Sequence, residues 1–458
     1  MKKIIGIFLI LIFGLTMIFF GVSCKTTTGG IVETTGGIAE TTAIEKTTTV
    51  TEVSVTEPEG KIKLSLWLTP LIAEGSLRSM VSDFNSSQDK IFVDLSMVDW
   101  ATGREQIKQA VGGGVGPDMF YLNGGLDQSY IDANALLPLS KAGYTKDDLN
   151  LFRPSIAINE VNGEILGLPI YFNAGVLYYR KDILKDYGFM APPTTWDELK
   201  NMAKTITEKS NGEIMGYQHK GGDDHLNAIN ITWQTFLEEA GGHFMDMATL
   251  KSTLNTPEGK TALEYIVSFY SEGISKLGPS SVNGFREGKI AMFEFTQSPI
   301  IVENFISNAN MKGKWAVAVS PKGPVSGGSY SCGESVVISS KTKYPEACGT
   351  FLKYFLRPEN MLLWMKGAYG IPVYDLDKIS KDKKVLVENF MAQDKENWDA
   401  ILKQLSLSAP YPTVEQRYGY TARWDAQKRY LISVLNGEIT VEKALESIDN
   451  EVNQSISK

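Results

Sequence analysis

Apolar and polar residues follow a repeating order from about Lys61 onward. Residues 62–68 are apolar at every second position, which predicts a β-strand. Residues 76–85 have apolar side chains at helical spacing, residues 92–98 predict a second strand, and residues 104–111 predict a second helix. Strands and helices in alternation predict parallel strands joined by right-handed crossovers. The expected fold class is therefore α/β.

The stretch of residues 112–140 predicts a third strand that delivers a binding loop. A Gly-rich loop ends at Asp118, the apolar run 119–122 predicts a buried strand, and the polar Asn123 follows directly. Ligands of open α/β sheets lie beyond the carboxyl ends of the strands. Trp67, at the end of the first strand, and Asn123 are therefore expected at one edge of the sheet.

The pattern restarts after residue 163. Residues 163–181 predict two short strands broken at Pro169, because proline fixes one dihedral angle and has no N–H for the ladder. Such a break suits a connection between two lobes. Thr195 is expected to cap the helix that follows it. Further elements are expected as helices over residues 127–135, 182–187, 228–240, 257–270 and 345–355, as strands over residues 290–295, 315–319 and 336–339, and as mostly helix in the last third of the chain.

The N-terminus has the layout of an export signal. Lys2 and Lys3 precede the apolar run 4–20, and small residues then lead to Cys24. This placement resembles a bacterial lipobox, which implies a signal peptide over residues 1–23, a lipid on Cys24, and a protein held outside the cytoplasm, in the periplasm or at the cell surface. The alternative is an uncleaved membrane anchor, although a run of about 17 residues is short for a span.

Residues 24–60 separate the signal from the folded region. They are rich in Thr and Gly and contain no aromatic residue, so they cannot bury enough apolar surface to offset the ordering of their backbone. A disordered tether to the membrane is therefore expected. The folded region of roughly 400 residues is long enough for two lobes.

Charge and cysteine content limit the partners. The formal net charge is −8 at pH 7, which argues against nucleic acid. Aromatic residues make up 10 % of the chain, enough to fill cores and also to line a ligand site. Cys332 and Cys348 could pair in an exported protein. We expect free thiols, because Cys332 falls in a Gly/Ser loop and Cys348 at a helix start.

Several sequence motifs occur in order through the folded region. They are PDMFYLN, NGEILGLPIYFNAGVLYYRKDIL, APPTTWDELKNMAKTIT, FREGKIAMFEF, KWAVAVSPKGPVSGGSYSCGESVVIS and NGEITVEKALESIDNEVNQ. In order and spacing they resemble the extracellular solute-binding proteins of sugar-importing ATP-driven transporters, over about residues 61–458.

This resemblance implies a two-lobe periplasmic-binding-protein fold of type II, like that of maltose-binding protein, with a ligand cleft between the lobes. The first lobe would comprise residues 61–170 and 314–370, and the second residues 171–313 and 371–458. The resemblance also implies a carbohydrate ligand, a transmembrane permease as partner, a monomer, no cofactor and no enzymatic activity.

A sugar ring has an apolar face and a rim of hydroxyl groups, so aromatic rings and amide or carboxylate groups are its expected contacts. Relatives often carry a Trp platform where this chain has Phe295 and Gln297, so Phe295 would stack on the sugar and Gln297 would hydrogen-bond to it. For the aromatic candidates the alternative is a place in the core. Tyr171, Tyr411 and Arg423 are weaker candidates. By resemblance, the ligand contacts are Trp67, Asn123, Phe172, Asn173, Trp233, Phe295, Gln297, Gly328, Ser329, Tyr330 and Tyr369.

Other kinds of site compete with a sugar cleft. His219 and the Asp-Asp-His run 223–225 have the ligand types of a metal site, but glycines make a solvated loop the favoured reading and no metal is expected. The Gly-rich run 112–116 lacks the spacing of a nucleotide loop and precedes a strand. An exported carbohydrate hydrolase stays open, because the distance between two carboxylates cannot be read from sequence. A non-sugar ligand such as a polyol phosphate is also open, although few Lys or Arg residues fall at the expected cleft positions.

Overall fold

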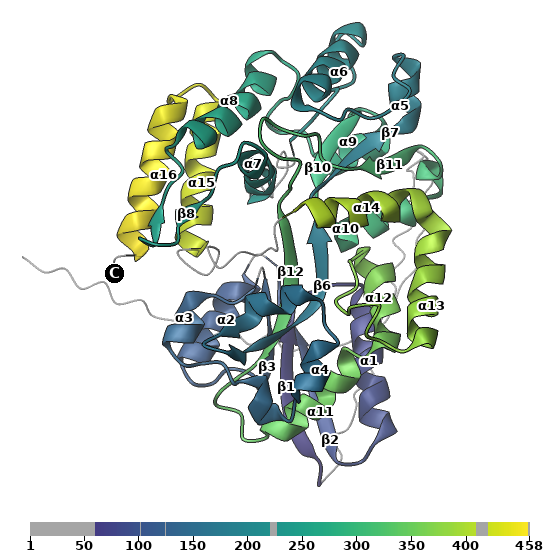
Figure 1. Ribbon diagram of the computed structural model, residues 1–458, viewed down its shortest axis with the longest axis vertical. Coiled ribbons are helices and arrows are strands. Elements are labelled where there is room, and N and C mark those ends of the chain that lie inside the picture. The colour runs from purple at the N-terminus through teal and green to yellow at the C-terminus, as the bar shows by residue number, and fades with distance from the viewer. Residues whose placement is uncertain (1–59, 101, 124, 220–226, 409–419, 457–458) are drawn as a thin grey trace, which may run out of the picture. The chain divides into compact units, whose positions relative to one another are not determined.

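Two β-sheets organise the chain (Figure 1). The computed structural model describes residues 60–456 except residues 101, 124, 220–226 and 409–419. The expected signal peptide, Cys24 and nearly all of the expected tether lie outside the described residues.

The first sheet has five strands: β1 Ile62–Leu68, β2 Ile91–Met97, β3 Met119–Asn123, β6 Gly167–Ala174 and β12 Ser331–Ile338. Their order in the sheet is β2-β1-β3-β12-β6. β1 is parallel to β2 and β3, whereas β12 is antiparallel to β3 and β6. The late strand β12 therefore lies beside strands from the start of the folded region (Figure 1).

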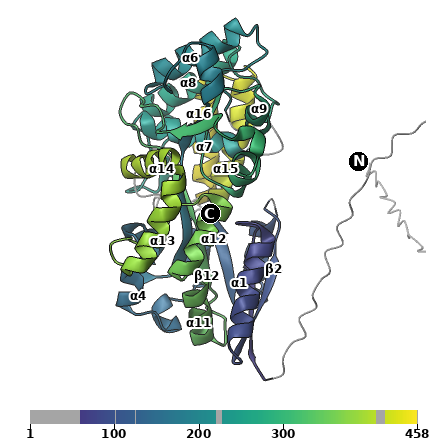
Figure 2. The ribbon, with the colours of Figure 1, turned by 90° about the vertical axis from the view of Figure 1, so that its right-hand side faces the viewer.

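Three helices contact the strands of this sheet: α1 Glu74–Ser87, α2 Gly103–Gly112 and α11 Pro345–Phe355. α1 and α11 also contact each other. α1 lies against β2 (Figure 2). Its buried residues recur at spacings of three and four, as a one-sided helix requires, and they are Leu77, Met80, Val81 and Phe84. The elements predicted for this region are confirmed up to the end of β3, with the α/β alternation.

The second sheet has three antiparallel strands: β7 Val176–Arg180, β10 Met292–Phe295 and β11 Trp315–Ala318, in the order β10-β7-β11. Both faces of β7 are buried, since Val176 and Tyr178 belong to one hydrophobic cluster and Leu177 and Tyr179 to another. Burial on both faces explains why β7 is a continuous apolar run from Val176 to Tyr179.

The pairing of β11 with β7 bears on the expected division into lobes. Residues 315–318 belong to the second sheet, although the sequence placed residues 314–370 in the first lobe. The chain returns to the first sheet only with β12. The other lobe boundaries stay a prediction.

The chain passes from the first sheet to the second at Gly175, so the predicted break at Pro169 is wrong. Pro169 lies inside β6, opposite Ser335, next to a bulge at which Ile170 is the extra residue of β6. β6 is an edge strand, and edges and bulges are where a sheet tolerates a residue without an N–H. At Gly175 a Cβ would lie 3.1 Å from the carbonyl oxygen of Tyr330, a distance that side chains rarely allow.

Thr195 caps α6, as predicted, because its side chain accepts a hydrogen bond from the Glu198 N–H. Short strands pair as β4 Glu160–Val161 with β5 Glu164–Ile165 and as β8 Met245–Asp246 with β9 Lys251–Ser252. The remaining helices are α3 Gln128–Asp132, α4 Lys146–Asn150, α5 Lys181–Asp186, α6 Trp196–Lys209, α7 Asn227–Glu239, α8 Pro257–Ser271, α9 Ser281–Glu287, α10 Pro299–Ile301, α12 Pro358–Ala368, α13 Lys381–Met391, α14 Lys395–Leu407, α15 Tyr420–Leu435 and α16 Val441–Ile456.

The C-terminal helices α15 and α16 pack against α7 and α8 (Figure 1). The last third of the described chain is thus mostly helical, as expected. In the ranges that the structure describes, no helix has both the length and the apolar character needed to cross a membrane.

Candidate functional site

The carboxyl ends of the parallel strands β1, β2 and β3 meet at one edge of the first sheet. Trp67, near the end of β1, is half-buried and packs against the first hydrophobic cluster. Asn123 ends β3 and is also half-buried. The structure therefore brings these two predicted residues to the same edge.

A row of polar side chains crosses the sheet at this edge. Asn123 of β3 is the register partner of Glu334 on β12, and Glu334 is in turn the partner of Tyr171 on β6. The Asn123 side-chain amide donates a hydrogen bond from Nδ2 to Oε1 of Glu334 at 3.0 Å. Glu334 is 4 % exposed. Burial raises its pKa to about 8, although the charge of Arg104 acts in the opposite direction.

Trp100 is a candidate that sequence reasoning missed. It follows β2, so it belongs to the same edge, and it is 41 % exposed. Its ring meets that of Tyr121 edge-on, with centroids 6.1 Å apart and planes at 79°. This contact fixes the ring and leaves part of its surface to solvent. A tryptophan at the carboxyl end of a predicted strand, where Trp67 also lies, was the signal that could have identified it.

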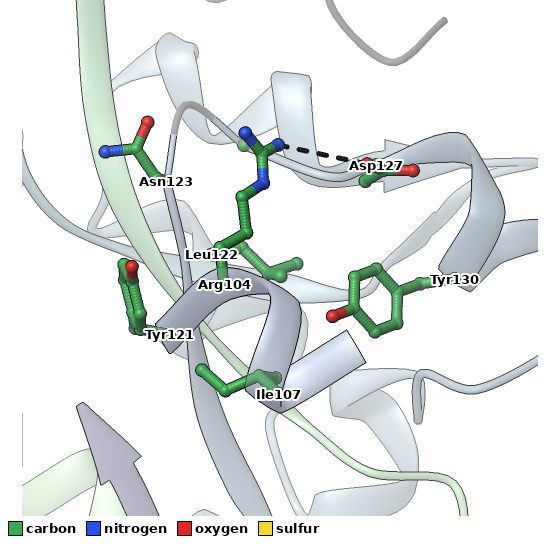
Figure 3. A pocket seen from close by; sticks show the side chains of 8 residues that line it. Arg104, Ile107, Tyr121, Leu122, Asn123, Asp127 and Tyr130 are labelled. Atoms are coloured by element: carbon green, nitrogen blue, oxygen red, sulfur yellow. Dashed lines mark ion pairs between the residues drawn. The ribbon is translucent and has the colours of Figure 1, made fainter. Parts of the chain in front are cut away.

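A small pocket lies at the end of β3, between α2 and α3 (Figure 3). It is shallow and partly open to solvent. Arg104 reaches across it to Asp127, with nitrogen and oxygen 3.8 Å apart. Tyr130 is buried, and its hydroxyl has no hydrogen-bond partner among the described residues. Asn123 completes the polar part of the lining.

Three of the predicted site residues instead stabilise the passage between the two sheets. Gln297 is fully buried, and its amide both accepts from the Ala174 N–H at 2.9 Å and donates to the Ala174 carbonyl at 3.0 Å. Asn173 is 5 % exposed and donates to the main-chain carbonyl of Gln297 at 3.2 Å. Phe172 is buried and bridges to Ile371. The expectation that Gln297 offers hydrogen bonds to a ligand is not met, because both ends of its amide are engaged.

The predicted loop before β12 has a similar place. The Ser329 hydroxyl donates to the Gly175 carbonyl at 2.7 Å, and the Gly175 N–H donates to the Tyr330 carbonyl at 2.6 Å. The Tyr330 N–H donates to the Thr235 hydroxyl of α7 at 3.2 Å. Gly328, Ser329 and Tyr330 are all buried. The loop thus connects the passage between the two sheets at Gly175 with α7.

Trp233 does not present its ring as expected. It is fully buried in the second hydrophobic cluster, on α7. On α15, which packs against α7, Gln427 is also fully buried, and neither end of its amide has a hydrogen-bond partner among the described residues. Arg423 is 2 % exposed, and its guanidinium lies 4.4 Å from the centre of the Phe244 ring.

The last predicted contacts are also enclosed. Tyr369 is 4 % exposed, and its hydroxyl donates to Oδ2 of Asp394 at 2.5 Å. Burial first, and then Asp394, raise the pKa of the Tyr369 hydroxyl. Phe295, at the end of β10, is 8 % exposed. Tyr411 lies outside the described residues.

A pair of buried acids bears on the hydrolase alternative. Glu239 of α7 and Glu294 of β10 both lie within hydrogen-bond distance of the single Ser320 hydroxyl, 2.6 Å away in the case of Glu239. The Trp196 indole donates to Glu239, and the Tyr217 hydroxyl donates to Glu294. Burial raises the pKa of both, that of Glu294 to about 7. Two acids on one hydroxyl, sealed from solvent, have neither the separation nor the access that glycoside hydrolysis requires.

His219 lies in the core, whereas the sequence suggested a solvated loop. It is fully buried, its ring packs among Tyr217, Phe269 and Tyr270, and burial lowers its pKa to about 3. The run 223–225 lies outside the described residues. Within the part of the chain that is described, no group of three His, Cys, Asp or Glu residues is placed to hold a metal.

Cys348 is a buried free thiol, as expected. Burial raises its pKa to about 12. A neutral thiol of this kind is a weak nucleophile. It therefore adds nothing to the chemistry of the site.

Residues 79–387 match the sequence profile of bacterial extracellular solute-binding proteins. A probable ABC transporter-binding protein of Deinococcus radiodurans is 29 % identical over 267 residues, which are 55 % of this chain and 61 % of that protein. A maltooligosaccharide ABC transporter solute-binding lipoprotein of Streptococcus pneumoniae is 23 % identical over 299 residues, 61 % of this chain and 63 % of that protein. The aligned regions thus span less than two thirds of either relative.

The fold has close structural counterparts. The solved structure of an ABC transporter solute-binding protein from Thermotoga lettingae, bound with α-D-tagatose, matches with a TM-score of 0.72 and 21 % identity, over 86 % of this chain and 100 % of that chain. The likeness confirms the expected two-lobe α/β fold.

Proposed function

Since the chain belongs to the family of bacterial extracellular solute-binding proteins, we propose that it captures a mono- or oligosaccharide and delivers it to the transmembrane permease of an ATP-driven importer. The relatives from Deinococcus radiodurans and Streptococcus pneumoniae, both ABC transporter binding proteins, support the importer role. The maltooligosaccharide of the pneumococcal relative supports a sugar as the class of ligand.

The observation that carries the sugar assignment is Trp100. Its ring is 41 % exposed at the carboxyl edge of the first sheet, and Tyr121 supports it edge-on. The apolar face of a pyranose stacks on such a ring, and each aromatic contact contributes about 1 kcal/mol beyond burial. Asn123, at the same edge, supplies a neutral amide for the hydroxyl rim.

The proposed contacts differ from the set expected from the sequence. We assign the ligand to Trp67, Trp100 and Asn123 on the first lobe. Gln297 and Ser329 form their hydrogen bonds with the main chain of Ala174 and Gly175. These bonds favour a role in stabilising the passage between the two sheets over a role in ligand binding. The opposite wall of the cleft is expected from the second lobe.

The cellular placement is part of the proposal. Lipidation of Cys24 after removal of residues 1–23 would anchor the protein, and the Thr- and Gly-rich residues 24–60 would form the tether. The pneumococcal relative is a lipoprotein, which supports this anchor. We propose that the protein acts as a monomer. Replacing Cys24 by alanine should release the protein from the membrane fraction, and retention of the variant there would contradict the lipid anchor.

A thermal-shift panel tests the proposed function. A neutral sugar that binds the folded state raises the melting temperature with its concentration by mass action. Maltose, maltotriose, arabinose and mannitol are suitable probes, and chromatography of each mixture shows whether the sugar stays intact. The proposal expects a concentration-dependent rise with at least one probe and no products. Product formation would favour the hydrolase, and the absence of any shift would contradict sugar capture.

A further inference from the structure

The strand β2 forms one edge of the first sheet. In the described part of the chain it has a neighbouring strand, β1, on one side only. The opposite edge, β6, is partly covered by main chain, because the Phe172 N–H donates to the Ile371 carbonyl at 3.2 Å and the Ile371 N–H donates to the Phe172 carbonyl at 2.7 Å. An uncovered edge presents N–H and C=O groups that can pair with another chain.

β2 lacks the features that commonly protect an edge strand, which are short length, proline, bulges and charged side chains. It has seven residues, IFVDLSM, and contains no proline. Its register with β1 is continuous, so it has no bulge. Asp94 is its one charged residue, and Lys63 of β1 lies 4.0 Å from that carboxylate. The sequence of β2 would therefore permit pairing with a further strand.

The main-chain groups of alternate residues of β2 point away from β1. The Lys90 carbonyl, just before β2, accepts from the Ile62 N–H of β1 at 2.8 Å. Successive residues of a strand direct their main-chain groups to opposite sides. Ile91, Val93 and Leu95 therefore present their N–H and C=O groups at the outer edge.

Two side-chain amides occupy the first of these outer groups. Asn85, in the last turn of α1, accepts from the Val93 N–H at 2.8 Å and donates to the Val93 carbonyl at 2.9 Å. Gln88, directly after α1, accepts from the Ile91 N–H and donates to the Ile91 carbonyl, both at 2.7 Å. α1 runs alongside β2 and so places both amides at the edge (Figure 2). An amide has one donor end and one acceptor end, so each side chain takes the place of a residue of a further strand.

We infer that Asn85 and Gln88 block the addition of a second copy of this chain at β2. A second copy is the expected occupant because two-fold symmetry brings the same edge of both molecules together. Copies anchored to one membrane through Cys24, as proposed above, would meet at a raised effective concentration. The inference thus extends the proposed monomer and does not depend on which ligand the protein binds.

A purely local role of the two amides has different consequences. Gln88 also accepts from the Lys90 N–H at 2.8 Å and donates to the Phe84 carbonyl at 3.2 Å, which stabilises the turn between α1 and β2. If the amides served only this turn, their loss would lower stability and leave the protein a monomer. If they block the edge, their loss causes self-association of a folded protein.

Sedimentation velocity and hydrogen exchange separate the two roles. The full chain carrying Cys24→Ala, which removes the proposed lipid, is the reference protein. Asn85→Leu, Gln88→Leu and the double variant are made in it. Asn201→Leu, which adds the same apolar side chain at an exposed position of α6, is the control. Each protein is measured over roughly a hundredfold range of concentration, and urea unfolding reports the fold.

The reference protein and Asn201→Leu are expected to stay monomeric over the whole range. The double variant should dimerise, with a dissociation constant at least tenfold lower than that of either single variant, because it frees two residues of the edge. Main-chain amides of residues 90–98 should exchange at least tenfold more slowly as the concentration of the double variant rises, since pairing protects the outer N–H groups.

A double variant that folds and stays monomeric would overturn the inference, whatever its loss of stability. Association without slower exchange in residues 90–98 would also overturn it, because the copies would then meet elsewhere. If the leucine variants do not fold, Asn85→Ala and Gln88→Ala carry the same expectations and the same contradicting outcomes. The sugar panel tests the proposed function separately, since sugar capture can fail while the edge of β2 is blocked.

Discussion

Exposure divides the tryptophan residues into those that stabilise the fold and those available to a ligand. Trp233, Trp364 and Trp398 are at most 2 % exposed, whereas Trp100 is 41 % exposed. A fully buried indole acts through apolar area and dispersion contacts. Substitution of the two kinds should therefore change different measurable quantities.

Trp233→Ala is expected to lower the free energy of unfolding by about 3–5 kcal/mol, because it empties a large volume inside the second cluster. Urea unfolding followed by circular dichroism measures this change. Trp100→Ala removes an exposed ring and should lower the free energy of unfolding by less than about 1 kcal/mol. If Trp233→Ala has unchanged stability and weaker sugar binding, Trp233 contacts the ligand and the structural role assigned to it here is wrong.

The sequence could place Asn123 but not the surroundings of Trp233 or Gln297. A polar residue directly after an apolar strand has few alternatives to the strand end, so Asn123 was predictable. Trp233 is enclosed by helices that come from distant parts of the chain, among them α15. The amide of Gln297 bonds to Ala174, 123 positions earlier. Contacts of such range leave no periodic trace in a sequence.

The buried acid pair links elements around the second sheet. The Ser320 hydroxyl has one proton, so it can donate to only one of Glu239 and Glu294, and the other acid must supply a proton of its own. The main-chain carbonyl of Glu239 also accepts from the N–H groups of Val325 and Ser326, at 3.0 and 3.1 Å. α7 thereby holds the loop that leads from β11 to β12.

This arrangement predicts a specific pH dependence of stability. Folding raises the pKa of Glu294 from 4.5 to about 7, so between these values the folded state binds more protons than the unfolded state. The free energy of unfolding should therefore fall as the pH rises from 4.5 to 7. The contribution of this group is up to about 3 kcal/mol.

Urea unfolding of the wild type and Glu294→Gln at pH 5, 6, 7 and 8 isolates this contribution. The stability of the wild type relative to the variant should decrease over the range and then level off. Glu346→Gln, at an exposed position on α11, is the control and should show a constant difference. If the difference in the free energy of unfolding between the wild type and Glu294→Gln is also constant with pH, folding does not raise the pKa of Glu294.

Most elements of the fold were predictable because each buries a face with a regular period. The passage between the sheets was not, because Pro169 has a stronger local signal than Gly175. The tolerance for Pro169 depends on β6 being an edge strand with a bulge at Ile170, directly after the proline. The need for glycine at 175 depends on the approach of Tyr330. Both depend on strand neighbours that only the folded chain brings together.

At the scale of the whole molecule, the charge and the site agree with a neutral ligand. The formal net charge is −8, which disfavours anions at long range. The polar edge of the first sheet adds an amide and a buried acid close to the proposed ligand. Under the proposed function, the two lobes would enclose such a sugar and present it to the permease.

Calorimetric titration of the best sugar from the panel into the wild type and Trp100→Ala tests the central claim most directly. A micromolar ligand corresponds to about 8 kcal/mol of binding free energy, and loss of the stacking ring should weaken it at least tenfold. Trp100→Phe should keep part of the affinity, and Tyr344→Ala, which removes a ring that is 43 % exposed before α11, should bind like the wild type. Wild-type affinity in Trp100→Ala would contradict a sugar held at the carboxyl edge of the first sheet.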